Sequence, residues 1–523
     1  MHNNFLIALL VFLISLSQYS CVSNNKSKRI IVASSGKIES LDPARASTLK
    51  SLQLLSSLGD TLYELNSEGE LIPELASGMP IFSKDKLQII INLKENVLFH
   101  DGTLFNSNAI KFSFDRFKRI GTMNYILGNK IKSIETPSEY KVIINLNKPS
   151  SSVNGLLTSI NLTPVSPTYY KDYSDKFLND KFVGTGKYIL KRFSNEIQII
   201  DPNLNYWSDE PNNEGISFIG YSNSSSLFGA LKSKQIDVLL SNSIDDIQRN
   251  NLNLLSNNKE IKEGKSPATE ISFISLRTNS YPLNNLNVRL AIAKSLNRDF
   301  ISEKVSYGLR QPSRSLVPPI YKKNKKELWP KYDPLEAKVL LQKEGYCNGN
   351  VLDFPLTYRS NVPADKLIAL SWQEQIKNIL NECINIRLNG VESTTIYKNL
   401  NLGIYTAVIL DWTGAYSDPE AYLTPLLSCS EIDGKNCKKG ESVYSGSFWG
   451  SNTVEDLFLD SENLNGKERL AKLIEIEKIA SESIPYIPIW ISSQKAWSQN
   501  EISKPIFNGA GIILMSDLKF INE

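Results

Sequence analysis

The residues with the clearest potential for binding chemistry lie together at positions 409–419, which read Ile-Leu-Asp-Trp-Thr-Gly-Ala-Tyr-Ser-Asp-Pro. Residues 403–408 before them are rich in β-branched and aromatic side chains and predict a buried strand. A core element would not carry two carboxylates, two aromatics, a glycine and a proline together. Because ligands collect at the carboxyl ends of strands in open α/β sheets, we expect this segment to hold a ligand. The alternative is an ordinary turn, with Gly414 and Asp418-Pro419 as its breakers.

Catalysis and metal binding have few candidate residues, because the chain has only two histidines, His2 and His100. His2 lies in a segment that we expect to be removed. One remaining histidine cannot build a His-based zinc site, and a Ser-His-Asp triad would depend wholly on His100. The sequence therefore predicts no catalytic residues and no metal site, and it favours a protein that is not an enzyme.

The composition describes a folded globular protein, and the length of the chain indicates more than one unit. A chain of 523 residues suggests roughly three structural units. The net charge of +3 is small for this length, and no basic run is interleaved with aromatics, so nucleic acid is not expected as a partner. No phosphate-binding loop or dinucleotide spacing follows the Gly-Thr-Gly at residues 184–186, so no cofactor is expected.

The first twenty residues read as an export signal. Residues 5–14 form an apolar run that is too short to span a bilayer but typical of a signal peptide. A small residue, Cys21 and a polar stretch follow it, which resembles the lipobox of bacterial lipoproteins, although Gln18 stands where a Leu is usual. We expect a signal peptide (1–20) and a tether (21–28) anchored to the membrane by lipid on Cys21. The alternative is an ordinary secretory signal cleaved nearby, which would leave the protein soluble in the periplasm.

Four further cysteines form an even set, which an oxidising compartment would allow to pair. Cys429 and Cys437 flank a short polar loop, so a bridge between them would be local. Cys347 and Cys383 each precede a predicted strand, at residues 352–358 and 384–388, and a strand-helix-strand unit would bring those two starts together. We therefore prefer the pairs 347–383 and 429–437 among the three possible connectivities. A zinc site is the rival interpretation, but no Cys-x-x-Cys spacing supports it.

Two amphipathic helices are predicted in the N-terminal part. Leu52, Leu55, Leu58 and Leu62 recur at helical spacing after a short strand at residues 29–34. Asn106 or Ser107 is expected to cap a second helix. Its apolar residues are Ile110, Phe114 and Phe117.

A series of ordered motifs resembles extracellular solute-binding protein family 5, the substrate-binding proteins of peptide and nickel ABC transporters. Departures from the family pattern include Met79-Pro80 in place of a Trp and Asn108 in place of an acidic residue. His100 falls on a motif position and is expected to stabilise a turn. The motifs are residues 62–64 (Leu-Tyr-Glu), 73–76 (Pro-Glu-Leu-Ala), 99–103 (Phe-His-Asp-Gly-Thr), 183–188 (Val-Gly-Thr-Gly-Lys-Tyr), 205–207 (Asn-Tyr-Trp), 287–293 (Asn-Val-Arg-Leu-Ala-Ile-Ala) and 485–490 (Pro-Tyr-Ile-Pro-Ile-Trp).

The resemblance implies an α/β fold of the periplasmic-binding-protein kind (class II, cluster C), with two lobes and an extra subdomain. Lobe I would comprise residues 29–65, 185–272 and 491–523, the extra subdomain residues 66–184, and lobe II residues 273–490. The chain would cross between the lobes near Phe273 and Trp490. The implied motion is hinge closure on a ligand.

The resemblance also implies ligand contacts in the segment at 409–419. Trp412 and Thr413 match main-chain positions that bind an extended peptide by strand addition, Tyr416 belongs to the same segment, and Ser47 to Leu49 match the opposite wall. The family's amine-binding Asp falls on Ala415, and a buried ammonium without a countercharge is costly. Asp411, where the family typically has Gly, is the candidate substitute.

The leading hypothesis is a substrate-binding lipoprotein of an ABC importer for a peptide or another small solute. It would capture the solute outside a bacterial membrane and deliver it to a permease and ATPase complex, and we expect it to act as a monomer. One alternative is a ligand-sensing module that signals to a receptor. The other is a secreted hydrolase, for which the chain offers no convincing nucleophile and base.

Overall fold

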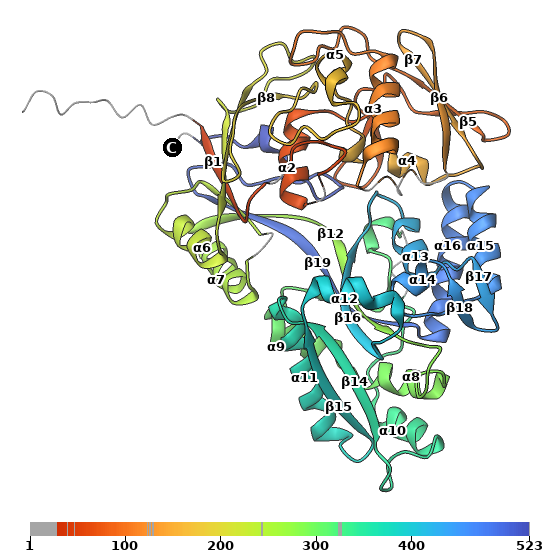
Figure 1. Cartoon of the computed structure of the whole chain (residues 1–523). Helices are drawn as coiled ribbons and strands as arrows, with labels where there is room; N and C mark the ends of the chain where they lie inside the picture. Colours follow the sequence, from red (N-terminus) through yellow and green to blue (C-terminus); the bar gives the residue numbers. More distant parts are fainter. Residues whose placement is uncertain are drawn as a thin grey trace, which may run out of the picture.

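The computed structural model describes residues 29–521, apart from residues 39, 47, 123, 125–126, 128–129, 242–243 and 323–326. The expected signal peptide, the tether with Cys21, and Ser47 therefore lie outside the described residues. Two parts of the molecule meet through one large mixed sheet (Figure 1). Within the described residues, no helix has the length and apolar character that a membrane span requires.

The large sheet has eleven strands in the order β15-β14-β16-β12-β19-β11-β1-β10-β9-β8, and β13 pairs with β19 beside this path. Its strands are β1 (Ile30–Ser35), β8 (Tyr188–Phe193), β9 (Ile197–Pro202), β10 (Ile216–Tyr221), β11 (Val238–Leu240), β12 (Ile261–Leu276), β13 (Gln311–Pro312), β14 (Leu352–Arg359), β15 (Ile384–Val391), β16 (Ala407–Thr413) and β19 (Tyr486–Gln499).

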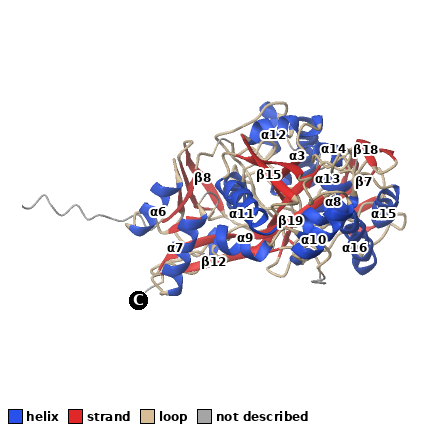
Figure 2. Cartoon of the chain, turned by 90° about the horizontal axis from the view of Figure 1, so that it is seen from below, coloured by secondary structure: helices blue, strands red, loops and turns tan. Residues whose placement is uncertain are grey.

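Two long antiparallel strands, β12 and β19, join the two parts of this sheet. They pair along most of their length, from Ile261↔Gln499 to Ser275↔Tyr486, with register shifts in between. At one end β19 pairs with β11, and at the other end β12 pairs with β16. Figure 2 shows β12 and β19 passing between helices of both parts. Any motion between the parts must therefore bend or twist these two strands.

The N-terminal part carries a second, antiparallel sheet in the order β4-β5-β7-β6 and a two-stranded pair, β2-β3. Helix α3 is capped by the side chain of Asn106, and Ile110, Phe114 and Phe117 are buried on it, as predicted. The elements are β2 (Tyr63–Leu65), β3 (Leu71–Pro73), β4 (Ile81–Phe82), β5 (Gln88–Asn92), β6 (Ile131–Ser138), β7 (Lys141–Leu146), α2 (Leu49–Leu58), α3 (Ser107–Ile120), α4 (Val153–Leu156), α5 (Pro167–Tyr170), α6 (Ser224–Lys232) and α7 (Asp246–Asn257).

The C-terminal part places helices around β14, β15 and β16, and it includes a small hairpin, β17-β18. Helix α11 connects the parallel strands β14 and β15, whose first residues Leu352 and Ile384 are paired. The elements are α8 (Leu286–Lys294), α9 (Arg298–Ser306), α10 (Pro334–Lys343), α11 (Pro363–Ile379), α12 (Ser393–Asn399), α13 (Glu420–Leu427), α14 (Glu441–Tyr444), α15 (Asn452–Glu462), α16 (Gly466–Ser483), β17 (Glu431–Asp433) and β18 (Asn436–Lys439).

Two large hydrophobic cores follow this division. One is built from residues between Ile271 and Ile491, and the other from residues between Ile30 and Leu240 together with residues between Ala496 and Leu518. The second core is one continuous cluster. It combines buried residues between positions 75 and 183 with buried residues from strands of the large sheet. The β4-β5-β7-β6 sheet thus shares its core with the rest of the N-terminal part.

The disulfides follow the preferred pairing: Cys347 bonds to Cys383, and Cys429 bonds to Cys437. The paired starts of β14 and β15 bring Cys347 and Cys383 together, with 4.0 Å between their Cα atoms.

Two sequence-based boundaries were wrong. The strand predicted at residues 403–408 is β16 at Ala407–Thr413, because its pairing with β12 runs from Ala407 to Thr413. Gly403 instead ends a short 3-10 turn with a left-handed backbone, φ 65°. Helix α2 ends at Leu58 rather than continuing to Leu62, which is buried beyond the helix.

Candidate functional site

Strand β16 carries three of the predicted site residues, Asp411, Trp412 and Thr413, within the large sheet. They pair with Ser272, Ile271 and Glu270 of β12. On the other side, the ladder with β14 ends at Thr357↔Val408. Residues 409–413 of β16 therefore have no partner strand on that side among the described residues. Such an edge exposes backbone N–H and C=O groups that an extended ligand can pair with.

The carboxyl end of β14 meets this edge through Arg359. Its guanidinium donates to both oxygens of Asp411, at 2.8 and 2.7 Å, and to both oxygens of Asp365, at 2.7 and 3.0 Å. A fifth hydrogen bond reaches the hydroxyl of Tyr397 on α12 at 3.1 Å. All five N–H donors of Arg359 are thus used. The two carboxylates raise the pKa of Arg359 against its burial, so the group of three has a net charge of −1.

A further carboxylate lies on the same face of the sheet. Glu270 pairs with Thr413, and residues two apart on a strand share a face, so Glu270 stands beside Asp411. The Glu270 side chain has no hydrogen bond or ion pair within the described residues. Burial raises the pKa of its carboxyl and Asp411 raises it further, while Arg310, Arg249 and Arg359 lower it. Glu270 thus places a second carboxylate beside Asp411 at the end of the β16 edge.

The loop after β16 is held in one conformation by Arg469 of α16. The guanidinium of Arg469 bonds both oxygens of Asp418 at 2.8 Å and one oxygen of Glu420 at 2.9 Å. Asp418 also accepts from the backbone N–H of Glu420, so it caps the start of α13. Gly414 is needed for a close approach, because a Cβ there would lie 2.7 Å from the ring of Tyr422.

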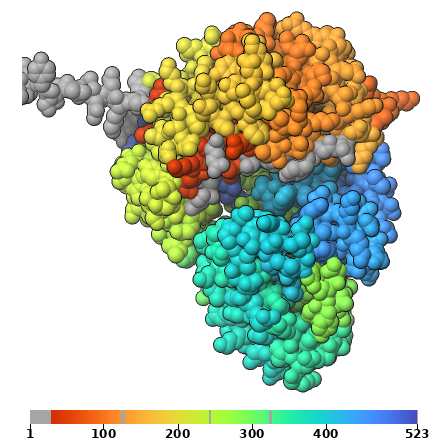
Figure 3. Space-filling model, in the orientation of Figure 1, coloured from red at the N-terminus to blue at the C-terminus, as the bar shows by residue number. Residues whose placement is uncertain are grey.

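The same loop touches the N-terminal part. A Cβ on Gly155 of α4 would lie 2.7 Å from the carbonyl oxygen of Ser417, so the two backbones are in direct contact. Lys130, just before β6, bonds Glu420 at 2.5 Å and the hydroxyl of Ser152 at 2.7 Å. A second ion pair joins Lys148 to Glu462 of α15 at 2.8 Å. Figure 3 shows the surface hollowed beside this contact, between the N-terminal part and residues coloured cyan.

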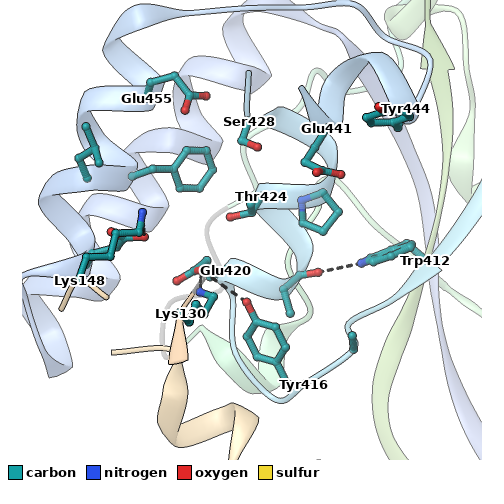
Figure 4. A pocket seen from close by; sticks show the side chains of 16 residues that line it. Lys130, Lys148, Trp412, Tyr416, Glu420, Thr424, Ser428, Glu441, Tyr444 and Glu455 are labelled. Carbon is teal, nitrogen blue, oxygen red and sulfur yellow. Dashed lines mark hydrogen bonds and ion pairs between the residues drawn. The ribbon is translucent and has the colours of Figure 1, made fainter. Parts of the chain in front are cut away.

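A cavity of about 690 Å³ adjoins this loop (Figure 4). Trp412, Ala415 and Tyr416 line it, and the indole N–H of Trp412 donates to the carbonyl of Ala421 at 2.8 Å. Helices α13, α14 and α15 supply most of the remaining wall, and Lys130 and Lys148 approach from the N-terminal part. The cavity thus lies where the two parts meet.

The structure brings the predicted residues of the 409–419 segment together but divides them between two surfaces. Asp411 lies with Arg359 at the sheet edge, and Trp412, Ala415 and Tyr416 face the cavity. Thr413 ends β16 and is exposed. Leu49 is the first residue of α2 in the N-terminal part, and it is not among the residues that line the cavity beside Trp412.

Sequence reasoning missed the partners of these residues. Arg359, Lys130 and Arg469 are 52, 290 and 51 residues from the carboxylates that they bind. One signal was present: Arg359 directly follows the predicted strand at residues 352–358, and strand carboxyl ends are where ligands collect.

His100 has a structural role, as expected. Its backbone N–H donates to the carbonyl of Gly184 at 2.9 Å, and its Nε2 lies 3.1 Å from the carbonyl oxygen of Gly186. Burial lowers the pKa of His100 to about 4, so the neutral ring donates this bond. Gly186 permits a close approach to Leu58, whose carbonyl carbon would lie 2.3 Å from a Cβ. Within the described residues, no group of three or more His, Cys, Asp or Glu side chains could hold a metal ion.

A two-part α/β molecule joined by paired strands, with a cavity and an unpaired strand edge where the parts meet, defines a solute-binding protein. Residues 70–434 match the model of the bacterial extracellular solute-binding proteins, family 5, and the chain belongs to this family. Proteins of this family bind solutes and are not enzymes.

Curated relatives include heme-binding protein A of Haemophilus influenzae, 25% identical over 456 residues (80% of this chain and 79% of the relative). A glutathione-binding protein of Escherichia coli is 23% identical over 504 residues, covering 95% and 94%. Similar solved structures are the periplasmic binding protein DppA of Helicobacter pylori with a bound peptide (TM-score 0.75, 23% identity, covering 96% and 100%) and NikA of Brucella suis with Fe(III)-EDTA (TM-score 0.82, 20% identity, covering 94% and 100%). These likenesses show the cluster C periplasmic-binding-protein fold across nearly the whole chain.

Proposed function

We propose that this protein is the substrate-binding lipoprotein of an ABC importer that takes up a peptide or another small solute. The unpaired edge of β16 at residues 409–413 carries this proposal. An extended ligand can bond to the main chain of Trp412 and Thr413 while its side groups enter the adjoining cavity. Relatives named for binding heme, glutathione and a peptide support a peptide or another small solute as the ligand.

Two positions, Ala415 and Asp411, bear on the charge of the ligand. Ala415 offers no carboxylate to an α-ammonium at the cavity wall. Asp411, whose side chain keeps 39% exposure beside Arg359, offers an acidic contact at the sheet edge to a cationic side group of the solute. The net charge of −1 on the Asp365–Arg359–Asp411 group leaves room for one further cation. The opposite wall, at Ser47 and Leu49, is assigned from the family resemblance alone.

Closure of two lobes would bury the solute. Lobe I comprises residues 29–65, 185–272 and 491–523, with the extra subdomain at 66–184, and lobe II comprises 273–490. The two main cores support this division, since one draws on residues 271–491 and the other on residues before 241 and after 495. The hinge would then lie in β12 and β19, near Phe273 and Trp490.

Export places the protein outside a bacterial membrane, anchored by lipid on Cys21 and acting as a monomer beside its permease and ATPase. Detergent-phase partitioning of the full chain tests the anchor against a Cys21→Ser variant. The wild type should enter the detergent phase and the variant should stay in the aqueous phase. Aqueous partitioning of both would refute the anchor.

The binding function is tested by native mass spectrometry of the purified protein for a co-purified solute, followed by thermal-shift screening of dipeptides. We expect stabilisation by some dipeptides that survives N-acetylation, because Ala415 cannot pair with an α-ammonium. Stabilisation that disappears on N-acetylation would refute the interpretation of Ala415. The absence of a co-purified solute together with no thermal shift from any peptide would refute the binding of peptides.

A further inference from the structure

The cavity beside Trp412 has an apolar wall and an unbalanced set of charges. Six side chains give it an aromatic and aliphatic surface: Trp412, Ala421, Pro425, Tyr444, Phe458 and Leu459. Six others bring charge to it: Lys130, Lys148, Glu420, Glu441, Glu455 and Glu462. Two cations thus face four carboxylates.

Both cations are already paired within the protein. Lys130 forms an ion pair with Glu420. Arg469 forms ion pairs with both Asp418 and Glu420. Lys148 bonds Glu462. Glu441 and Glu455 form no ion pair among the described residues, and Lys148 acts on Glu455 only at longer range. The cavity therefore has a formal charge of −2.

The two remaining carboxylates are held over the cavity by different helices. Within the described part of the chain, Glu455 on α15 accepts one hydrogen bond, from the backbone N–H of Cys429 at 2.7 Å, and its other oxygen accepts none. Glu441 begins α14 and makes no side-chain hydrogen bond or ion pair within the described residues. In Figure 4 Glu455 extends from α15 toward Ser428, and Glu441 lies on the other side of Ser428, beside Tyr444. Partial burial raises the pKa of each carboxyl, although Glu441 is exposed as a whole residue, and at Glu455 the N–H of Cys429 and the charge of Lys148 oppose the rise.

We infer that this cavity binds an ammonium group of the solute, carried on an aliphatic stem, with Glu441 and Glu455 as its counter-charges. The stem would contact Phe458, Leu459 and Pro425, and the ammonium would lie near the rings of Tyr444 and Trp412, where a cation is attracted to the aromatic faces. An anionic or uncharged polar group would leave the two carboxylates unbalanced. This inference rests on the proposed function and names the chemical class of its ligand.

The test compares lysine with norleucine, which has the same stem without the charge. N-acetylated tripeptides carry either residue at one position among alanines, so the lysine ammonium is the peptide's only cation. Isothermal titration with the mature protein measures Kd for each peptide. At one position we expect lysine to bind about tenfold more tightly than norleucine, since hydrogen bonds to charged, partly buried groups carry about that factor.

The Glu441→Gln/Glu455→Gln double variant should bring the lysine-to-norleucine ratio close to one while retaining the Kd for the norleucine peptide. That retained Kd shows that the variant is folded. Glu468→Gln, which removes an exposed carboxylate at the start of α16 outside the cavity, is the matched control and should keep the wild-type ratio. Thr424→Trp, which fills the cavity from α13, should weaken both peptides relative to trialanine.

Equal binding of lysine and norleucine by the wild type would overturn this inference and leave the solute-binding function intact. A lysine preference that persists in the double variant would also overturn it, because the counter-charge would lie elsewhere. If neither these tripeptides nor the dipeptides bind, the peptide function fails and this inference fails with it.

Discussion

Arg359 uses all five of its N–H donors in hydrogen bonds within the protein, and its two carboxylate partners differ in burial. The Asp365 side chain is 3% exposed and the Asp411 side chain is 39% exposed. The contact with Asp365 is therefore the structural one, and the contact with Asp411 can be shared with a ligand.

This difference predicts unequal costs for two matched substitutions. Asp365→Asn should lower the free energy of unfolding by about 3 kcal/mol, because it breaks a buried pair. Asp411→Asn should cost about 1 kcal/mol or less, since an exposed partner is screened by water. Urea unfolding of both variants measures the difference. Equal costs would mean that Asp411 is as structural as Asp365, and it would no longer qualify as a ligand contact.

His100 predicts a pH dependence of stability. Its folded pKa of about 4 lies below the unfolded value of 6.5, so the unfolded chain binds more protons between these values. Stability should therefore fall as the pH drops from about 6.5 to 4, with a contribution of about 3 kcal/mol from this residue. His100→Gln retains an N–H donor toward Gly186 without titrating. Its unfolding free energy, measured at pH 7 and pH 4.5, should change less than that of the wild type, and an unchanged slope would contradict this assignment.

At the scale of elements, the two disulfides close loops of different length. Cys347–Cys383 links the turn that precedes β14 to the residue before β15 across 36 residues, and Cys429–Cys437 spans 8 residues around the β17-β18 hairpin. The longer loop restricts the unfolded chain more strongly.

Removal of the two bridges should therefore have different costs. Chain-entropy estimates are about 4 kcal/mol for the Cys347→Ala/Cys383→Ala variant and about 2.5 kcal/mol for the Cys429→Ala/Cys437→Ala variant. Thermal unfolding of the two double variants under identical conditions tests this order. A reversed order would indicate that the short bridge stabilises the native wall around Glu455 more than it restricts the unfolded chain.

Local patterns predicted the elements well. The cap at Asn106, the buried face of α3 and the strand-helix-strand unit that pairs Cys347 with Cys383 all depend on neighbouring residues. The position of β16 does not. Its bounds depend on pairing with β12, more than 130 residues earlier, so the strand includes Asp411 and Trp412, which local composition assigned to the loop.

The sequence predicted which segment forms the site, but not how its side chains and their partners are arranged in space. Asp411 and Ala415 could be singled out from the sequence because they depart from a family pattern. The partners in their surroundings come from distant parts of the chain: Arg359 ends β14 and bonds Asp411, while Lys130 lies just before β6 and bonds Glu420. No spacing in the sequence relates them. Packing of the two parts brings them together, which is a property of the folded chain.

At the scale of the whole molecule, the contact between the two parts is uneven. Lys130 and Glu420 are mostly buried, with side chains 19% and 7% exposed, whereas Lys148 is 50% exposed beside Glu462. The Lys130–Glu420 pair therefore contributes more than the Lys148–Glu462 pair to keeping the parts together. When the contact opens, Glu420 loses the charge of Lys130 and is left as a buried, poorly compensated carboxylate. Arg469 neutralises Glu420 only partly, since it also binds Asp418.

Lys130→Met should accordingly shift the molecule toward an open arrangement. Small-angle X-ray scattering should give a larger radius of gyration for this variant without ligand, and a binding solute should restore the wild-type value at a higher concentration, because closure must be driven by binding energy. Lys148→Met is the matched control and should behave as the wild type. If both variants keep the wild-type radius of gyration, the Lys130–Glu420 pair does not govern closure, and the hinge strands β12 and β19 alone would set the resting arrangement.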